Sequence, residues 1–225
     1  MLKKSNHSFL YLISIFRNES KFISPSPKLK YNSSMREKLI LGILFVLGNA
    51  LGVVPIVGQE GVYRPNQYSA WLNSIQNNPT SHVTSSLLFL IGAIAGILLG
   101  SWLYQQGKRY AGLFLSMGSA YNAFWIPVAL VLTEVGADVS SFGLAMALFA
   151  DSLFNGLLGL SMVFLGCSLW SDGRKLLGGF GVVIGCVTSF VFAQFWLASA
   201  ANLLGIIGPC WLVWWLVWSF RKTAG

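Results

Sequence analysis

Residues 39–57 read LILGILFVLGNALGVVPIV, which is a run of 19 residues without a charged side chain. A helix rises about 1.5 Å per residue, so a run of this length comes close to the roughly 30 Å hydrocarbon core of a bilayer. A helix on the surface of a soluble domain would carry charges on its water-facing side. The run therefore predicts a transmembrane helix.

The same pattern recurs five times further along the chain. Hydrophobic residues make up 55% of the 225 residues and charged residues only 10%, whereas soluble domains average about 25% charged. We therefore predict an all-α, polytopic membrane bundle, and we exclude a water-soluble enzyme, a disordered chain and a disulfide scaffold. The six predicted spans cover residues 39–57, 83–104, 110–132, 142–169, 176–197 and 203–220.

The net charge of +8 is concentrated before the first span, because residues 1–38 carry eight basic and two acidic side chains. Cytoplasmic loops of membrane proteins carry an excess of lysine and arginine, so the pattern predicts that both termini are cytoplasmic. We expect a multi-pass protein of the plasma (inner) membrane that does not bind nucleic acid. Three basic pairs, each closing an apolar run, support this orientation: Lys108/Arg109, Arg174/Lys175 and Arg221/Lys222.

Two domains of very different character are expected, a flexible basic tail over residues 1–34 and the bundle over residues 35–225. The apolar stretch of the tail, residues 9–16, is too short to span a bilayer. Arg17, Asn18 and Glu19 follow it where a signal peptide would have small residues. We expect the tail to contact anionic lipid headgroups, and a cleaved targeting segment is the alternative.

The segment between the first two spans predicts one short helix on the outer side. Within residues 66–78, Tyr68, Trp71, Leu72 and Ile75 follow helical spacing with amides opposite. We expect an interfacial helix that lies on the lipid headgroups, and a cap over the outer end of the bundle is the alternative.

Small residues form two ladders at helical spacing. Gly92, Gly96 and Gly100 follow one another on the second span, and Gly181, Gly185 and Ser189 do so on the fifth. Such ladders allow helices to approach closely. They could pack within the chain, or they could join a homo-oligomer or a partner in a membrane complex. We find no internal repeat in the sequence.

Motifs for nucleotides, metals and redox groups are missing from the sequence. No Gly-x-x-x-x-Gly-Lys-[Ser/Thr] occurs, and the two histidines and three cysteines lack metal-ligand spacing. We therefore expect no cofactor and no metal.

Polar residues inside the predicted spans are the candidates for function, because each costs free energy in hydrocarbon. Asp151 leads them, since no basic residue lies at its predicted depth, and Asn155 follows one turn later on the same face. Other polar residues fall in the outer halves of the spans, which predicts a polar cavity open to the outside with Asp151 near its floor. Hydrogen bonding between helices is the alternative role for the amides and hydroxyls. The remaining candidates are Asn122, Tyr121, Asn49, His82, Ser85 and Gln194.

These observations favour a small-solute carrier or a ligand-binding membrane protein with Asp151 as the binding or proton-exchanging group. A non-catalytic accessory or assembly subunit of a membrane complex is the first alternative. An intramembrane enzyme acting on a lipid or isoprenoid is the second, and we consider a non-enzyme more consistent with a single intramembrane acid.

Overall fold

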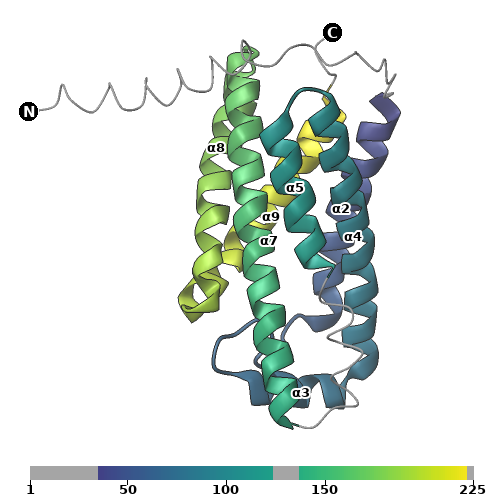
Figure 1. Ribbon diagram of the computed structural model, residues 1–225, viewed down its shortest axis with the longest axis vertical. Helices are drawn as coiled ribbons and strands as arrows, with labels where there is room; N and C mark the ends of the chain where they lie inside the picture. The colour runs from purple at the N-terminus through teal and green to yellow at the C-terminus, as the bar shows by residue number, and fades with distance from the viewer. Residues whose placement is uncertain (1–34, 124–136, 222–225) are drawn as a thin grey trace, which may run out of the picture. The chain divides into compact units, whose positions relative to one another are not determined.

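The computed structural model describes residues 35–123 and 137–221, and these residues form helices, turns and loops without a strand (Figure 1). The predicted tail over residues 1–34 lies outside the described part of the chain. The helices are α2 (Met35–Val53), α3 (Tyr68–Asn77), α4 (Pro79–Gln105), α5 (Arg109–Asn122), α7 (Ala137–Ser171), α8 (Lys175–Phe190) and α9 (Ala198–Phe220), with the 3-10 turns η2 (Val54–Ile56) and η3 (Val191–Phe195).

Five helical segments of the described residues are long and apolar enough to cross a membrane, which confirms the prediction of a multi-pass, all-α membrane protein. The predicted span over residues 110–132 begins as α5, and its second half lies outside the described residues. Pro55 lies in η2, where the first span tightens into a 3-10 turn. The five segments are Met35–Ile56, Pro79–Gln105, Ser141–Ser171, Lys175–Phe195 and Ala198–Phe220.

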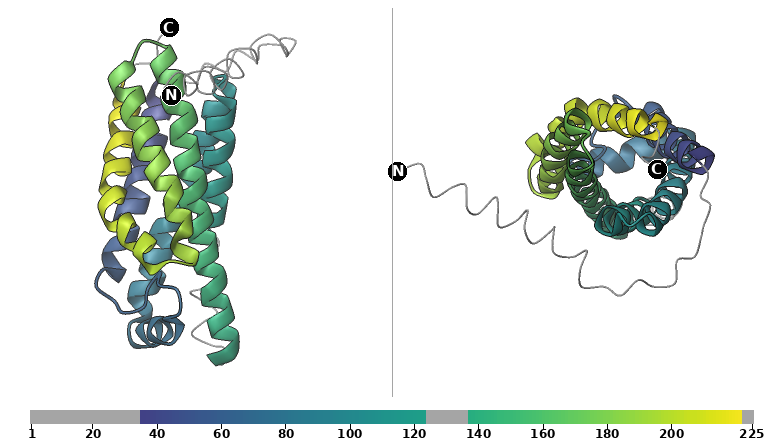
Figure 2. Two further views of the ribbon diagram at one scale, coloured as in Figure 1. Left: turned by 90° about the vertical axis from the view of Figure 1, so that its left-hand side faces the viewer. Right: turned by 90° about the horizontal axis from the view of Figure 1, so that it is seen from above.

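Six of the helices pack side by side in a closed ring (Figure 2). In ring order they are α2, α4, α5, α7, α8 and α9, and α9 packs back onto α2. Aromatic side chains of the neighbouring helices α2 and α9 meet inside the ring of helices: the aromatic centroid of Phe45 lies 5.9 Å from that of Trp211 and 5.6 Å from that of Trp215. Trp102 and Trp218 meet in the same cluster at 6.2 Å. The interior of the ring between α2, α4 and α9 therefore holds a packed aromatic core.

The glycine ladder on α4 is used within the chain. A Cβ on Gly92 would lie 2.7 Å from Asn49 Nδ2 of α2, and one on Gly100 would lie 2.6 Å from the Gly112 carbonyl oxygen of α5. A Cβ on Gly96 would meet Phe45 and Ser119. Neighbouring helices of the same chain already occupy this face. The expectation that Gly92, Gly96 and Gly100 could bind a second copy or a partner was therefore wrong.

Two hairpins of the ring have the same structure, so the expectation that the chain has no internal repeat was wrong. The sequences are GSWLYQQGKRYAG (100–112) and GCSLWSDGRKLLG (166–178). Gly107 and Gly173 both have φ of +81°, a conformation that favours glycine, and the next residues have ψ of 57° in both hairpins. Gly112 packs against the Tyr104 backbone as Gly178 packs against that of Trp170, since an added Cβ would lie 2.6 Å from the amide nitrogen in both.

A third helix pair, α9 with α2, follows the same pattern without a loop. Gly42 of α2 packs against Ser219 of α9. Ser219 lies two residues before the C-cap of α9, and Tyr104 and Trp170 occupy the same position relative to the ends of α4 and α7. The ring thus consists of three similar helix pairs, α4–α5, α7–α8 and α9–α2. A basic residue precedes the packing glycine by four positions in every pair: Lys108, Arg174 and Lys38. We call the end of the ring that carries these three residues the basic end.

The short helix α3 covers the opposite end, which we call the capped end (Figure 1). Trp71 and Ile75 are fully buried there against Leu144 and Leu148 of α7 and Phe89 of α4. The expectation that this helix lies on lipid headgroups was therefore wrong. Its apolar face packs on protein, because α7 extends far enough beyond the ring to receive it.

Candidate functional site

Asp151 forms a polar group with two amide side chains. Gln194 Nε2 donates a hydrogen bond to Asp151 Oδ2 from η3. Asn155 Nδ2 donates to the same oxygen at 3.2 Å and to the Asp151 carbonyl at 2.9 Å, because it follows one turn later on α7. The 3-10 turn after α8 packs on α7 and so delivers Gln194 to the carboxylate.

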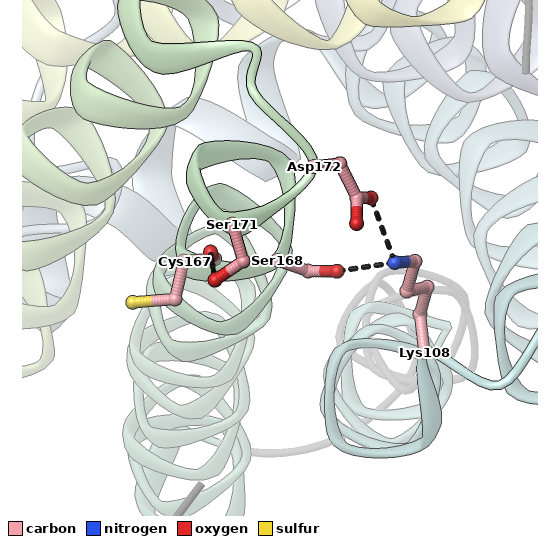
Figure 3. Close-up of polar contacts among 5 residues, drawn as sticks. All are labelled: Lys108, Cys167, Ser168, Ser171 and Asp172. Carbon is pink, nitrogen blue, oxygen red and sulfur yellow. Dashed lines mark hydrogen bonds and ion pairs between the residues drawn. The ribbon is translucent and has the colours of Figure 1, made fainter. Parts of the chain in front are cut away.

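The charge of Asp151 has no cationic partner among the described residues. Asp172, unlike Asp151, pairs with a cation, since it lies 3.0 Å from Lys108 Nζ at the basic end (Figure 3). Gln194 is fully buried, and its Oε1 has no hydrogen-bond partner in the described part of the chain. Two acceptors, a partly buried carboxylate and a buried amide oxygen, are therefore held together, and a proton or a cation would compensate the partly desolvated charge.

Tyr63 packs against the apolar cluster at the capped end. It lies in the loop between η2 and α3 with φ of 56°, and its ring centroid is 5.1 Å from that of Trp71. Burial, and secondly the negative charge of Asp151, raises the pKa of the Tyr63 phenol well above its ordinary value of 10.0. The sequence did not indicate Tyr63, because a loop tyrosine outside the spans has no pattern that relates it to α7.

Asn49 and Asn122 form a second polar contact. Asn122 Nδ2 of α5 donates to Asn49 Oδ1 of α2 at 3.0 Å, and Asn49 Nδ2 donates to the Phe45 carbonyl at 2.8 Å. Both side chains are buried. On α2 and α7, the candidate polar residues lie between the aromatic core and the apolar cluster beneath α3.

Ser85 and His82 hold the capped end together. Ser85 Oγ donates to the Gly52 carbonyl at 2.6 Å, which joins α4 to α2. His82 Nε2 lies 3.1 Å from Ser74 Oγ of α3, and Ser74 in turn contacts Gln59 Oε1. His82 is fully buried, and its Nδ1 has no hydrogen-bond partner in the described residues. These contacts fit a structural role in fixing the cap.

Tyr121 does not join the Asp151 group. Its side chain is 40% exposed and lies on the outer surface of the ring. A recess of about 370 Å³ opens at the capped end, and it does not include Asp151. No group of three or more His, Cys, Asp or Glu side chains among the described residues is suited to a metal ion. The recess is lined by Gly58, Gln59, Glu60, Ala70, Asn73, Ser74, Asn77 and Asn78.

Comparison with known proteins adds no assignment: no family model, no curated protein and no solved structure matches this chain. The functional argument therefore depends on the residues of the ring alone.

Proposed function

We propose that this membrane protein is a small-solute carrier or ligand-binding protein in which Asp151, with Gln194 and Asn155, forms the binding group. The observation that supports this most is the partly buried carboxylate whose hydrogen bonds come from neutral amides. Asparagine or glutamine would serve equally well for hydrogen bonding between helices at a lower cost in hydrocarbon. A charged side chain at this position is therefore explained by the binding of a ligand or the exchange of a proton.

The donor and acceptor pattern favours a solute with a positive charge and N–H donors. Asp151 supplies the negative charge, and the free Gln194 Oε1 supplies a second acceptor beside it. An ammonium group has only donors, so both protein groups match it. A proton on Asp151 would satisfy the carboxylate in the absence of such a solute.

The arrangement of helix pairs supports a carrier. Carriers are commonly built from internal repeats, including parallel repeats related by an axis along the membrane normal. Here the hairpins α4–α5 and α7–α8 run in the same direction and share their turn geometry. The aromatic core fills the ring between the polar group and the basic end, so the ring does not form an open channel. A transported solute would therefore require the helix pairs to move apart.

A thermal-shift comparison tests this proposal. The purified chain would be heated with a panel of small primary and quaternary amines, and the same panel would be applied to Asp151→Asn and to the control Asp172→Asn. We expect an amine that raises the unfolding midpoint of the wild type and of Asp172→Asn and has no effect on Asp151→Asn. Equal stabilisation of Asp151→Asn, or no stabilisation of the wild type by any amine, would contradict the proposal and favour an accessory subunit.

A further inference from the structure

The carboxylate of Asp151 borders a space inside the ring of helices. Asp151 is partly exposed, although it lies in the middle of the inward face of α7. Residues three and four positions apart lie on one face of a helix. The neighbours of Asp151 on this face are at most 4% exposed: Ala147, Leu148, Phe154 and Asn155. The exposed part of Asp151 therefore borders the interior of the ring, and the outer surface is on the other side of α7.

Aromatic side chains bound this space on the side of the basic end. Phe154 follows Asp151 by three residues on α7, which runs from the capped end to the basic end. Its ring centroid lies 6.4 Å from that of Trp211 on α9. Phe45 of α2 lies 5.9 Å from the same indole. Three helices therefore contribute to one aromatic surface, one helical turn from the carboxylate.

The indole nitrogen of Trp211 has no hydrogen-bond partner within the described residues, although the side chain is only 5% exposed. A Cβ on Gly208 would lie 4.0 Å from this nitrogen, and no other side chain or neighbouring helix would lie within 4 Å of it. Gly208 precedes Trp211 on α9, which runs from the capped end to the basic end. The unused N–H donor therefore borders open space on the side of the aromatic surface where Asp151 lies.

We propose that Asp151, Gln194, Phe154 and Trp211 form one binding site, and that its ligand is an amine with an apolar body and a neutral oxygen acceptor. This inference rests on the proposed function, since the ammonium binds Asp151 and Gln194 Oε1. The apolar body packs on Phe154 and Trp211, where an aromatic ring gains edge-to-face contacts. A hydroxyl or carbonyl oxygen of the body accepts the hydrogen bond of Trp211 Nε1, which a buried donor requires.

The charges of the site favour a monocation over a zwitterionic amino acid. Asp151 supplies a negative charge, and the other groups that define the site are neutral. The donors beside the carboxylate are the amides of Gln194 and Asn155. A ligand carboxylate in this space would be desolvated without a cation, which is costly. The structure therefore favours amines without an acid group.

The test measures apparent affinities from the thermal unfolding midpoint of the purified full chain at increasing concentrations of three probes. These are methylammonium, phenethylamine and phenylalanine. Phenethylamine adds an apolar body to the first probe and lacks the carboxylate of the third. It should bind at least about tenfold more tightly than methylammonium, the value of burying an aromatic group. Phenylalanine should not stabilise the protein.

A second series tests the acceptor. It consists of phenethylamines that carry one hydroxyl group on the ring or on the side chain. At least one should bind about fivefold more tightly than the parent amine, the value of one hydrogen bond. Trp211→Phe keeps an aromatic ring and removes the N–H, so it should abolish this advantage. Trp214→Phe is the matched control and should preserve it, because Trp214 Nε1 already donates to the Leu177 carbonyl at 2.9 Å.

Phe154→Leu gives an independent comparison if Trp211→Phe does not fold. It should lower the ratio of phenethylamine affinity to methylammonium affinity by about threefold or more, through loss of the aromatic contact. Equal affinities for these two probes, tight binding of phenylalanine, or a series in which no hydroxyl improves binding would each overturn the proposal and leave an amine site at Asp151 intact. A hydroxyl advantage that persists in Trp211→Phe would overturn it as well. If no amine binds at all, the proposed function itself fails.

Discussion

Asn122 Nδ2 donates a hydrogen bond to Asn49 Oδ1 at 3.0 Å, and this contact joins α5 to α2 across α4. The two helices are not neighbours in the ring, so their side chains must pass the face of the helix between them. Gly92 of α4 makes this passage open, since a Cβ there would lie 2.7 Å from Asn49 Nδ2. The polar contact and the glycine therefore form one structural unit.

Removal of either asparagine should lower the stability of the ring. Asn49→Ala and Asn122→Ala should each cost about 0.6 kcal/mol and at most about 1.7 kcal/mol, the average and the maximum measured for hydrogen bonds between membrane helices. Unfolding of the purified protein by a denaturing detergent would measure the loss. The double variant should cost less than the sum of the single ones, and strict additivity would show that the two side chains do not interact.

Gly92→Ala should destabilise the protein more than either asparagine variant. The new methyl group would overlap Asn49 and force α2 and α4 apart along a tightly packed face. Gly205→Ala is the matched control, because nothing lies within 4 Å of the position of its Cβ. Similar unfolding midpoints for the two variants would contradict the packing described for α4.

The basic end should face the cytoplasm and the capped end the opposite side. Reporter fusions in the loop at residues 106–108 and at residues 76–78 should report opposite compartments, with the first cytoplasmic. α4 runs between these two positions over 27 residues. Reports from the same side would show that α4 does not cross the membrane.

Sequence reasoning predicted the spans because their signal is local: an apolar run of sufficient length has few alternatives in lipid. The burial of α3 could not be predicted in this way, because it depends on a second helix that is distant in the sequence. Trp71 and Ile75 show an apolar face, but only the length of α7 determines that Leu144 and Leu148 cover it.

The internal repeat was missed for two reasons. The matching stretches at residues 100–112 and 166–178 share few identical residues apart from their glycines, and the third pair is divided between the two ends of the chain. One part of the candidate site could be predicted: Asp151 and Asn155 are four residues apart, so helical spacing places them on the same face. Tyr63 could not be predicted, because its position against the cap depends on the course of a loop.

The pairing of α9 with α2 predicts that the chain tolerates circular permutation. A variant that joins Arg221 to Met35 through a short linker and opens the chain between Gly107 and Lys108 keeps all three helix pairs. It should insert and unfold within about 2–4 °C of the wild type, a change of about 1 kcal/mol for a chain of this size. A permutant opened inside α7 is the control, and it should fail to fold. Failure of both would mean that the pairs are not equivalent units.

Tyr63 should titrate well above the ordinary pKa of a tyrosine. Because its folded pKa is raised above the ordinary 10.0, the folded state holds this proton when the unfolded chain has lost it. Its contribution to stability is therefore complete below pH 10 and decreases as the pH rises beyond that value. Ultraviolet titration of tyrosinate should show a delayed component that Tyr63→Phe removes. If Tyr63→Phe leaves the titration curve unchanged, the surroundings of Tyr63 do not raise its pKa.

The replacement of Asp151 by asparagine tests the central claim most directly. Asp151→Asn keeps the size and a hydrogen-bond donor but removes the charge and the exchangeable proton. It should insert and fold as well as the wild type, because the cost of a carboxylate within a membrane span is lost. The measurement is complementation of whatever defect deletion of the protein causes, at matched membrane levels, with Asp172→Asn as the control. We predict that Asp172→Asn restores function and Asp151→Asn does not. Full complementation by Asp151→Asn would show that Asp151 is only a hydrogen-bonding group between helices.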